Sequence, residues 1–488
     1  MKILLINPPG DLERFLGKGR NFVPSFEPLG LLYISAVCKQ YGYEVNVLDA
    51  FAQKMTQEDI KNTIAKDRPD VVGFTSFISN GGLIYELGRW IKSEYPGITV
   101  VFGNIHAGVY AEAYLRNNCC DIVVHGEGEY VFLKILENIK QGGSNFSDIP
   151  SISFLHNSEF ITTSGPAVVE NLSLLPLPDR DALKQDLYNI SALSNMPYIG
   201  NKNRVAKHML TSRGCLFSCF FCVVHNKKGQ RFNGLDQVLN EIELLINKYQ
   251  AEYIFFMDPL FISKKERVMN LCSEIKKRKL FFKWGCEGHI NFVDRELITE
   301  MESAGCHDIA FGIESGVQRL LNNVRKGTRL EEINSAISLI KKNTRIKVSG
   351  LFILGLPGET YTDSLCTIKF AKELPLDMAQ FSICVPYPGS PIFYELRNKG
   401  QIDTGIRDNG ALDTSVWLRY SAYISFTPNE PIWVTPALNS ELLKKLQKKA
   451  LREFYFRPVQ IYNNLKRVNF ANLWSSTATF KDMLFEKE

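Results

Sequence analysis

Short apolar runs and amphipathic stretches alternate along the first third of the chain. Each run is rich in β-branched residues and ends in polar or glycine residues, and the apolar positions of the following stretch recur at helical spacing. Strands that alternate with helices in this way build parallel βαβ units. We therefore expect residues 1–142 to form a five-stranded, doubly wound, Rossmann-like α/β domain. The expected strands cover 2–7, 43–48, 71–75, 98–102 and 122–124, and the expected helices cover 29–41, 57–66, 82–95, 109–117 and 129–140.

The alternation stops after residue 142 and resumes near residue 201. Apolar runs at 151–155 and 159–163 flank His156-Asn157-Ser158, a pattern typical of a β-hairpin, and a proline-rich stretch follows. We interpret 143–200 as a linker that contains this hairpin. Residues 201–425 then predict a partial or complete (β/α)6 barrel of the TIM type. Its strands are expected at 209–211, 253–257, 282–284, 309–313, 347–354 and 378–384, and its helices at 235–249, 264–279, 295–304, 331–342 and 361–374.

The remaining residues, 426–488, are less regular and contain one basic helical stretch at 441–454. We expect a mixed helical tail that caps the barrel. Its aromatic residues favour packing, and the alternative is that they select an apolar or aromatic substrate. The aromatic cluster begins shortly before this tail, at Trp417, Tyr420, Tyr423, Phe426 and Trp433.

Polar and glycine residues gather where the strands of the first domain end. Ligands of doubly wound sheets bind beyond these carboxyl ends. The first strand ends in Asn7-Pro8-Pro9-Gly10, which lacks the G-x-G-x-x-G of a dinucleotide site. The glycines follow later strands instead, so they either build a flat, backbone-lined surface for a large planar ligand or form ordinary tight turns. The residues concerned are Asn7-Pro8-Pro9, Asp49, Thr75-Ser76, Gly103 to His106 and Gly126 to Glu129.

Composition narrows the class of protein. The chain has 488 residues, a formal charge of +5 and 11 cysteines. This length exceeds one typical domain, and the small basic excess is spread too thinly to indicate a nucleic-acid surface. The apolar start breaks at two prolines, and no stretch is long enough to span a bilayer, so we expect a cytoplasmic chain without a transmembrane segment. Cysteines in a reducing compartment are more often structural, catalytic or metal-binding than disulfide-linked.

Three cysteines stand apart from the rest by their spacing. Cys215, Cys219 and Cys222 form C-x3-C-x2-C in the loop after the first expected barrel strand. Three thiolates can hold three irons of a [4Fe–4S] cluster and leave the fourth iron open for chemistry. The alternative is a zinc site with His225 as a fourth ligand, because structural zinc is bound by four closed ligands.

The cysteine loop and the motifs that follow it resemble the radical S-adenosylmethionine (SAM) enzymes. An aromatic residue before the last cysteine, a D-P-L-F segment, F-G-I-E-S, G-L-P-G-E-T and P-Y-P-G-S-P occur in the family's order. Pro259 stands where relatives usually carry a second acid. The resemblance implies a [4Fe–4S] cluster on the three cysteines, and it implies SAM-binding roles for Phe221, Asp258, Glu314, Ser315, Gly355 and Pro357.

The first domain is similar to the cobalamin-binding domain that precedes the barrel in one large radical SAM class. The chain lacks the D-x-H-x-x-G motif, and Asn104 replaces a glycine that is common there. We therefore expect the corrin to be held by backbone and loop contacts without a protein imidazole on cobalt. The resemblance implies cobalamin contacts from Asp49, Thr75, Ser76, Gly103, His106, Gly126 and Glu127.

The two resemblances together imply an enzyme that methylates an unactivated carbon of a small molecule, through a 5′-deoxyadenosyl radical and methylcobalamin. An electron donor such as flavodoxin or ferredoxin is implied as a partner. The first alternative is a radical SAM oxidoreductase or cyclase of the same architecture, and the second is a non-enzymatic zinc or Fe–S module. His289 is either a substrate-facing acid or base or a wall residue, and no catalytic residue or substrate is assigned.

Overall fold

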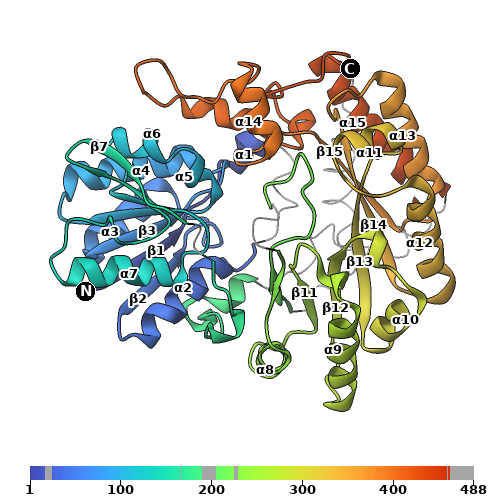
Figure 1. Ribbon diagram of the computed structural model, residues 1–488, viewed down its shortest axis with the longest axis horizontal. Coiled ribbons are helices and arrows are strands. Elements are labelled where there is room, and N and C mark those ends of the chain that lie inside the picture. Colours follow the sequence, from blue (N-terminus) through green and yellow to red (C-terminus); the bar gives the residue numbers. More distant parts are fainter. Residues whose placement is uncertain (17–24, 166–167, 189–204, 225–228, 459, 462–488) are drawn as a thin grey trace.

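The computed structural model describes residues 1–16, 25–165, 168–188, 205–224, 229–458 and 460–461. Two α/β bodies lie side by side, with the N-terminal body at the left of Figure 1 and the barrel at the right. This architecture confirms the expected fold class. Among the described residues, no helix is long and apolar enough to cross a membrane.

The N-terminal sheet has seven strands in the order β2-β1-β3-β4-β5-β6-β7, so the expectation of five strands is wrong. The added strands are those of the hairpin, which we had placed in the linker. β6 pairs antiparallel with β5, and Phe154 lies opposite Ile122. The hairpin joins the sheet because its alternating apolar residues, Ile152 and Phe154, belong to the same core as β5. The strands are β1 (Lys2–Asn7), β2 (Glu44–Asp49), β3 (Val71–Thr75), β4 (Thr99–Gly103), β5 (Ile122–Val124), β6 (Ile152–His156) and β7 (Glu159–Thr162).

Helices cover both faces of this sheet. Apolar residues of α2 (Leu29–Gln40) and α7 (Glu129–Lys140) pack on one face. Those of α3 (Gln57–Asp67), α4 (Gly81–Glu94), α5 (Ile105–Val109) and α6 (Ala111–Arg116) pack on the other. The helix expected at 109–117 is α6, and the short helix α5 precedes it and meets it at Tyr110. A short helix, α1 (Leu12–Leu16), follows β1.

The second sheet has six parallel strands in the order β8-β11-β12-β13-β14-β15. No described strand joins β15 back to β8, so the described residues form an open, partial barrel with helices outside (Figure 1). Its strands are β8 (Ala206–Met209), β11 (Tyr253–Phe256), β12 (Lys283–Gly288), β13 (Cys306–Glu314), β14 (Lys347–Leu354) and β15 (Met378–Ile383). Its helices are α8 (Leu235–Asn247), α9 (Lys265–Lys277), α10 (Arg295–Ser303), α11 (Gln318–Asn323), α12 (Leu330–Asn343), α13 (Tyr361–Glu373) and α14 (Pro391–Asn398).

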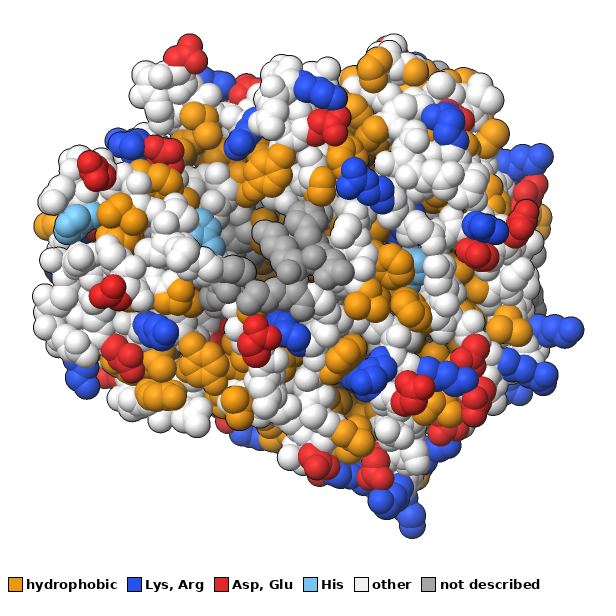
Figure 2. Space-filling model, in the orientation of Figure 1, with side chains coloured by type: hydrophobic (Ala, Val, Ile, Leu, Met, Phe, Trp, Pro, Cys, Tyr) orange, Lys and Arg blue, Asp and Glu red, His pale blue; other side chains and the backbone are white. Residues whose placement is uncertain are grey.

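The C-terminal part contacts both bodies. Trp417 belongs to an apolar core that holds residues of both bodies, such as Tyr114 and Val324, whereas α15 (Ser440–Tyr455) packs against β15 and α13 of the barrel. On the face shown in Figure 2, basic and acidic side chains are interspersed over the barrel helices. The visible described surface therefore carries no large patch of one charge.

Candidate functional site

Two short, paired strands flank the cysteine loop. β9 (Ser212–Arg213) precedes the cysteines, and β10 (Arg231–Phe232) follows them and pairs with it. Gly214 has a φ of 87°, and a Cβ there would lie 2.3 Å from the carbonyl oxygen of Gly229. Only glycine fits this turn, which points the chain toward the first cysteine.

The three thiols of the cysteine loop differ in burial. Cys219 is buried, and Cys215 and Cys222 are half-buried. Burial raises the pKa of Cys219 to about 11 in the absence of iron. The amide N–H of Val224 donates to the Cys222 Sγ at 3.3 Å, as amides commonly do around cluster thiolates. No three described His, Cys, Asp or Glu side chains lie close enough to share one metal ion, and His225 lies outside the described residues.

Asp258 supports the start of the cysteine loop. Its buried carboxylate accepts hydrogen bonds from the Thr211 backbone N–H at 2.6 Å, the Thr211 hydroxyl at 2.5 Å and the Ser212 hydroxyl at 2.6 Å. Burial raises the pKa of this carboxyl. Among the described residues, these contacts hold the chain just before Cys215.

Glu314 has the geometry of a ligand-binding residue. It ends β13 at a bulge, with a φ of 66° that is costly for a residue with a side chain. Its carboxylate pairs with the buried ammonium of Lys326, 2.8 Å away. Burial lowers the pKa of Lys326, but the nearby Glu314 and Cys219 outweigh burial and raise it. Sequence reasoning missed Lys326, whose motif R-K-G-T carries no specific signal.

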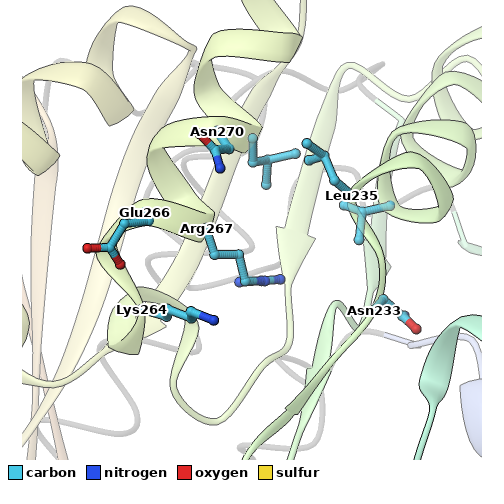
Figure 3. A pocket seen from close by; sticks show the side chains of 8 residues that line it. Asn233, Leu235, Lys264, Glu266, Arg267 and Asn270 are labelled. Atoms are coloured by element: carbon cyan, nitrogen blue, oxygen red, sulfur yellow. The ribbon is translucent and has the colours of Figure 1, made fainter.

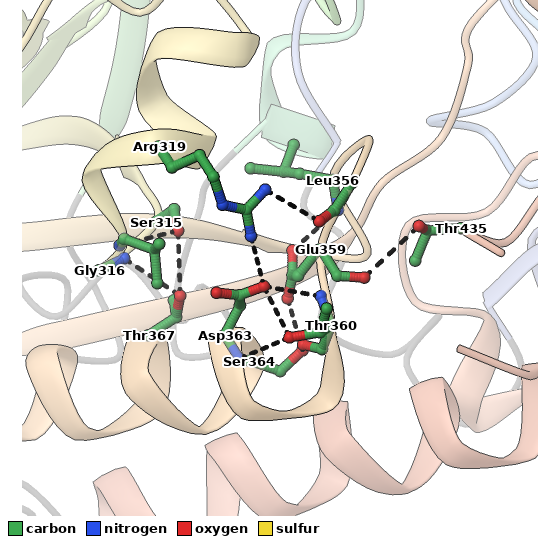
Figure 4. A network of polar contacts seen from close by, with 12 residues as sticks. Ser315, Gly316, Arg319, Leu356, Glu359, Thr360, Asp363, Ser364, Thr367 and Thr435 are labelled. Atoms are coloured by element: carbon green, nitrogen blue, oxygen red, sulfur yellow. Dashed lines mark hydrogen bonds and ion pairs between the residues drawn. The ribbon is translucent and has the colours of Figure 1, made fainter. Parts of the chain in front are cut away.

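The other implied SAM residues are spread around the strand ends. Ser315 is buried and shares a hydrogen bond with the Thr367 hydroxyl at 3.1 Å (Figure 4). Phe221 is half-buried against an apolar core that holds residues of both bodies. Gly355 is buried, and a Cβ there would lie 3.1 Å from Leu443 of α15. Pro357 is half-buried in the following loop.

The G-L-P-G-E-T loop is held by a buried acid. The Glu359 carboxylate accepts hydrogen bonds from the Leu356 N–H at 2.8 Å and from the Ser364 hydroxyl at 2.5 Å. Thr360 and Asp363 cap the helix that follows, and Arg319 contacts Asp363 at 2.7 Å (Figure 4). Burial raises the pKa of Glu359 to about 7. The loop shape therefore depends on a side chain that the sequence did not single out.

A cavity of about 670 Å³ lies between the two bodies. From the N-terminal body, its wall includes Thr75, Gly103, Gly126 and Glu127. The residues from the barrel are His208, Leu210, Arg213 and Met257. Gly30 and Gly103 also line it, and a Cβ at either position would meet no protein atom within 4 Å. Open backbone of this kind suits close approach by a flat, bulky ligand such as a corrin.

Three of the implied cobalamin residues lie outside this wall. The buried Asp49 carboxylate accepts from the Asn7 side-chain amide at 2.8 Å and from the Tyr188 hydroxyl at 2.5 Å. Ser76 Oγ is 2.8 Å from His106 Nδ1, and the Trp417 ring covers His106 edge-on at 4.6 Å. Burial lowers the pKa of His106 to about 3. These three side chains support the strand ends from behind.

Glu127 lines the cavity between the two bodies, but arginines bind its carboxylate. Arg231 binds both oxygens, at 3.0 and 2.5 Å, and Arg213 lies 3.4 Å away. The Val169 N–H adds a hydrogen bond of 2.6 Å. The sequence did not single out either arginine, although Arg213 is only two residues from Cys215.

A second, smaller cavity of about 270 Å³ lies between the starts of α8 and α9 (Figure 3). Arg267 reaches into this region, and its guanidinium also donates to the Thr211 carbonyl oxygen at 3.3 Å. Lys264, Asn233 and Asn270 lie around the opening.

The fold and the three-thiol loop define a class of two-domain α/β proteins in which a doubly wound domain faces the cysteine loop of a partial barrel. A family model described as "B12 binding domain" matches residues 19–136. A second, described as "Radical SAM superfamily", matches residues 209–371. An uncharacterized methyltransferase of Pyrococcus horikoshii is 30% identical over 464 residues, which cover 94% of this chain and 93% of that protein. This chain therefore belongs to the radical SAM enzymes that carry an N-terminal B12-binding domain.

Two further similarities extend over most of the chain. The anaerobic magnesium-protoporphyrin IX monomethyl ester cyclase of Rubrivivax gelatinosus is 27% identical over 82% of this chain and 71% of its own length. The radical SAM methyltransferase TsrM of Kitasatospora setae, solved with cobalamin and a [4Fe–4S] cluster, superposes with a TM-score of 0.67. That match has 17% identity and covers 96% of this chain and 89% of TsrM, so it shows a shared fold.

Proposed function

We propose that this enzyme is a cobalamin-dependent radical SAM methyltransferase that acts on a carbon of a small molecule. One observation carries the proposal. The cavity between the two bodies is lined both by the carboxyl ends of the N-terminal strands and by Arg213, which opens the cysteine loop. A corrin in this cavity would face the barrel, where SAM and substrate bind in the same family.

We assign the cluster to Cys215, Cys219 and Cys222, and the polar end of SAM to Glu314 with Lys326. Phe221, Ser315, Gly355 and Pro357 complete the proposed SAM site, and Asp258 supports it from behind. Thr75, Gly103 and Gly126 are the proposed corrin contacts, with Asp49, Ser76 and His106 holding the strand ends. When bound, the cluster supplies an electron to SAM and cobalamin carries the methyl group.

The protein itself positions the bound groups and excludes water from them. The buried Glu314–Lys326 pair offers both charges, and each complements one charge of an amino acid zwitterion such as the methionyl end of SAM. Asp258 and Gly214 fix the cysteine loop, and Glu359 fixes the loop after β14. Preorganisation of this kind removes the entropy cost of bringing reacting groups together.

The domain assignment follows the same proposal. Residues 1–142, with the hairpin of the expected 143–200 linker, form the cobalamin-binding domain, residues 201–425 form the radical SAM core, and residues 426–488 form the cap. We also propose a cytoplasmic enzyme that is reduced by flavodoxin or ferredoxin. The support is that all 11 cysteines are free thiols, as expected in a reducing compartment.

Anaerobic reconstitution tests the proposal. The protein is loaded with iron, sulfide and hydroxocobalamin, desalted, and then given a reductant, SAM with a labelled methyl group and candidate substrates. We expect retained cobalamin absorption, 5′-deoxyadenosine and a labelled product. Loss of all cobalt absorption on desalting would contradict the cobalamin assignment, and zinc without iron or sulfide would favour the metal-module alternative.

The second candidate is a ring-forming or oxidising radical SAM enzyme, favoured by the similarity to the magnesium-protoporphyrin cyclase. The same incubation separates the two functions. An altered substrate without label from the SAM methyl group, with 5′-deoxyadenosine formed, would support the cyclase class.

A further inference from the structure

His289 lies against the cysteine loop at the end of a barrel strand. It follows β12 directly, and its imidazole stacks on the Phe217 ring, with the ring centres 3.9 Å apart and the planes 15° from parallel. Phe217 stands between Cys215 and Cys219 in the chain. Because His289 is only 5% exposed, it is a buried contact of the loop that carries the proposed cluster.

Both ring nitrogens of His289 are hydrogen-bonded, and their partners fix the tautomer. The backbone N–H of Asn291 donates to Nδ1 at 3.4 Å. Nδ1 therefore carries no hydrogen, and the Nε2–H donates to the carbonyl oxygen of Lys326 at 3.3 Å. Burial and the nearby Lys326 ammonium lower the pKa of His289 to about 4, in agreement with a neutral ring. Of the two roles that the sequence left open for His289, these contacts favour the wall residue.

The short turn after β12 binds two consecutive carbonyl groups of one loop. His289 donates to Lys326, and the Asn291 side-chain amide donates to the carbonyl oxygen of Gly327 at 2.9 Å. On the other side, the Lys326 backbone N–H donates to the carbonyl oxygen of Leu321 at 3.0 Å. These contacts hold the backbone of Lys326 from both sides, so they determine where its buried side chain begins.

Lys326 is the partner of Glu314 in the proposed SAM site, with 2.8 Å between ammonium and carboxylate. We propose that His289 is a positioning residue that fixes Lys326 relative to the cysteine loop, so that the Glu314–Lys326 pair meets SAM beside the cluster. The inference rests on the proposed function, because it takes this pair to bind the methionyl end of SAM. The hydrogen bond holds Lys326 and the ring stack holds Phe217, so one side chain determines the spacing of both.

Two substitutions separate the hydrogen bond from the ring stack. His289→Phe keeps a flat ring against Phe217 but has no donor for the Lys326 carbonyl, whereas His289→Gln has an amide donor but no ring. The full-length protein is reconstituted with iron and sulfide, left oxidised so that SAM is not cleaved, and dialysed against SAM with a labelled methyl group. We expect His289→Phe to bind SAM about 2- to 12-fold more weakly, the usual worth of one neutral hydrogen bond. His289→Gln should bind SAM at close to the wild-type level.

Iron and sulfide content and urea unfolding show whether each variant is loaded and folded. His307→Phe is the matched control, because this half-buried histidine lies at the start of β13, the strand that Glu314 ends, and it should bind SAM like wild type. Asn291→Ala is a second variant at an exposed residue, and the loss of its hydrogen bond to Gly327 should also weaken SAM binding. If His289→Phe does not fold, an unchanged SAM affinity in Asn291→Ala overturns the inference.

A double substitution tests whether His289 acts through Lys326. We expect Lys326→Met to weaken SAM binding, and we expect His289→Phe to add no further loss in that background, because the effects of residues that act through one another are not additive. A structural role of the ring that does not involve Lys326 would give the same additional loss in both backgrounds.

Three results would overturn the inference. They are wild-type SAM affinity in folded, cluster-loaded His289→Phe, an equal loss of affinity in His289→Phe and His289→Gln, and an additive loss in the Lys326→Met background. Wild-type SAM affinity in Lys326→Met would instead remove the proposed SAM site, so the failure of the inference and the failure of the proposed function are distinguishable.

Discussion

Buried acids in this protein differ in role according to what donates to them. Asp258 accepts hydrogen bonds from the chain before Cys215 and lies 3.8 Å from the Arg267 guanidinium, and Glu359 accepts from its own loop and from Ser364. Glu314 instead pairs with Lys326 in a strained backbone conformation. Acids satisfied by the backbone hold loops in shape, whereas a strained acid beside a buried cation is suited to bind a ligand.

The cysteine assignment predicts the effect of a single substitution. Cys219→Ala removes one of three iron ligands, so we expect the broad iron–sulfur absorption and the reductive cleavage of SAM to be lost. Visible spectroscopy and 5′-deoxyadenosine analysis measure both. Cys366→Ala is the control, because this cysteine is exposed on α13. Retained cleavage in Cys219→Ala would remove the cluster assignment.

A substitution of His106 should affect the stability of the protein and its affinity for cobalamin differently. His106→Ala leaves a hole beneath Trp417, and we expect a loss of roughly 2–4 kcal/mol in the free energy of unfolding. Cobalamin affinity should change less than stability does, since His106 is outside the cavity wall and only supports the strand ends that line it. Urea unfolding and a corrin absorbance titration measure the two effects. A large loss of cobalamin affinity with unchanged stability would contradict this placement.

The burial of Glu359 predicts that the stability of the folded protein depends on pH. Its pKa rises from 4.5 to about 7 on folding because the carboxyl is buried. The folded protein thus holds this proton more tightly than the unfolded chain. Protonation of Glu359 therefore adds about 3 kcal/mol to the free energy of unfolding below pH 4.5, and this contribution is lost as the pH rises to about 7. Glu359→Gln should lack this part of the decline.

Unfolding in urea at several pH values between 4.5 and 7.5 measures that difference. Glu441→Gln serves as a control, because Glu441 is an exposed carboxyl at the start of α15. Identical pH slopes for wild type and Glu359→Gln would refute the assignment.

At the scale of elements, amphipathic pattern predicted most helices but not how they pair with sheets. The stretch expected at 441–454 is α15, and its apolar face packs on the last barrel strand. Gln447 donates to the carbonyl oxygens of Phe381 and Ala422, at 2.8 Å each. The helix is therefore part of the barrel wall, although its basic composition resembles a solvated surface helix.

Substitutions at two adjacent residues test this packing. Leu446→Ala should reduce the free energy of unfolding by about 2–5 kcal/mol, because Leu446 is 1% exposed in the barrel core. Lys445→Ala should cost less than about 1 kcal/mol, since its ion pair with Glu441 is exposed. Thermal and urea unfolding compare the two. Equal effects would show that α15 is not seated on the barrel.

For the whole molecule, a buried group of charges joins the two bodies. Arg180, in the segment between them, binds Glu27 of the N-terminal body and Glu241 of α8, the latter at 2.8 Å. It also donates to the carbonyl oxygen of His208 at 2.8 Å. All of these residues are nearly inaccessible to water. Paired internal charges therefore join the two bodies, in addition to apolar contacts.

Removing the central cation should weaken this junction. Arg180→Met leaves the buried Glu241 carboxylate without this partner and leaves Glu27 with Lys207, 3.5 Å away, and we expect a cost of about 3–5 kcal/mol. Differential scanning calorimetry should show the two bodies melting in separate transitions. Arg407→Met, which breaks only exposed pairs with Asp403 and Asp413, should melt like wild type. A single unshifted transition for Arg180→Met would contradict the role of this cluster.

The sequence alone determined the α/β class, the order of the elements and the three-cysteine loop, because periodicity and short motifs are local properties of the chain. It predicted the hairpin but not that the hairpin joins the first sheet, since the pairing of β6 with β5 is a tertiary contact. Lys326, Arg231 and Glu129 also depend on the tertiary structure. Each lies far along the chain from its partner or carries no motif. Only folding brings these opposite charges together in a dry interior, so only the tertiary structure shows which ion pairs form and which Glu129 oxygen has no donor among the described residues.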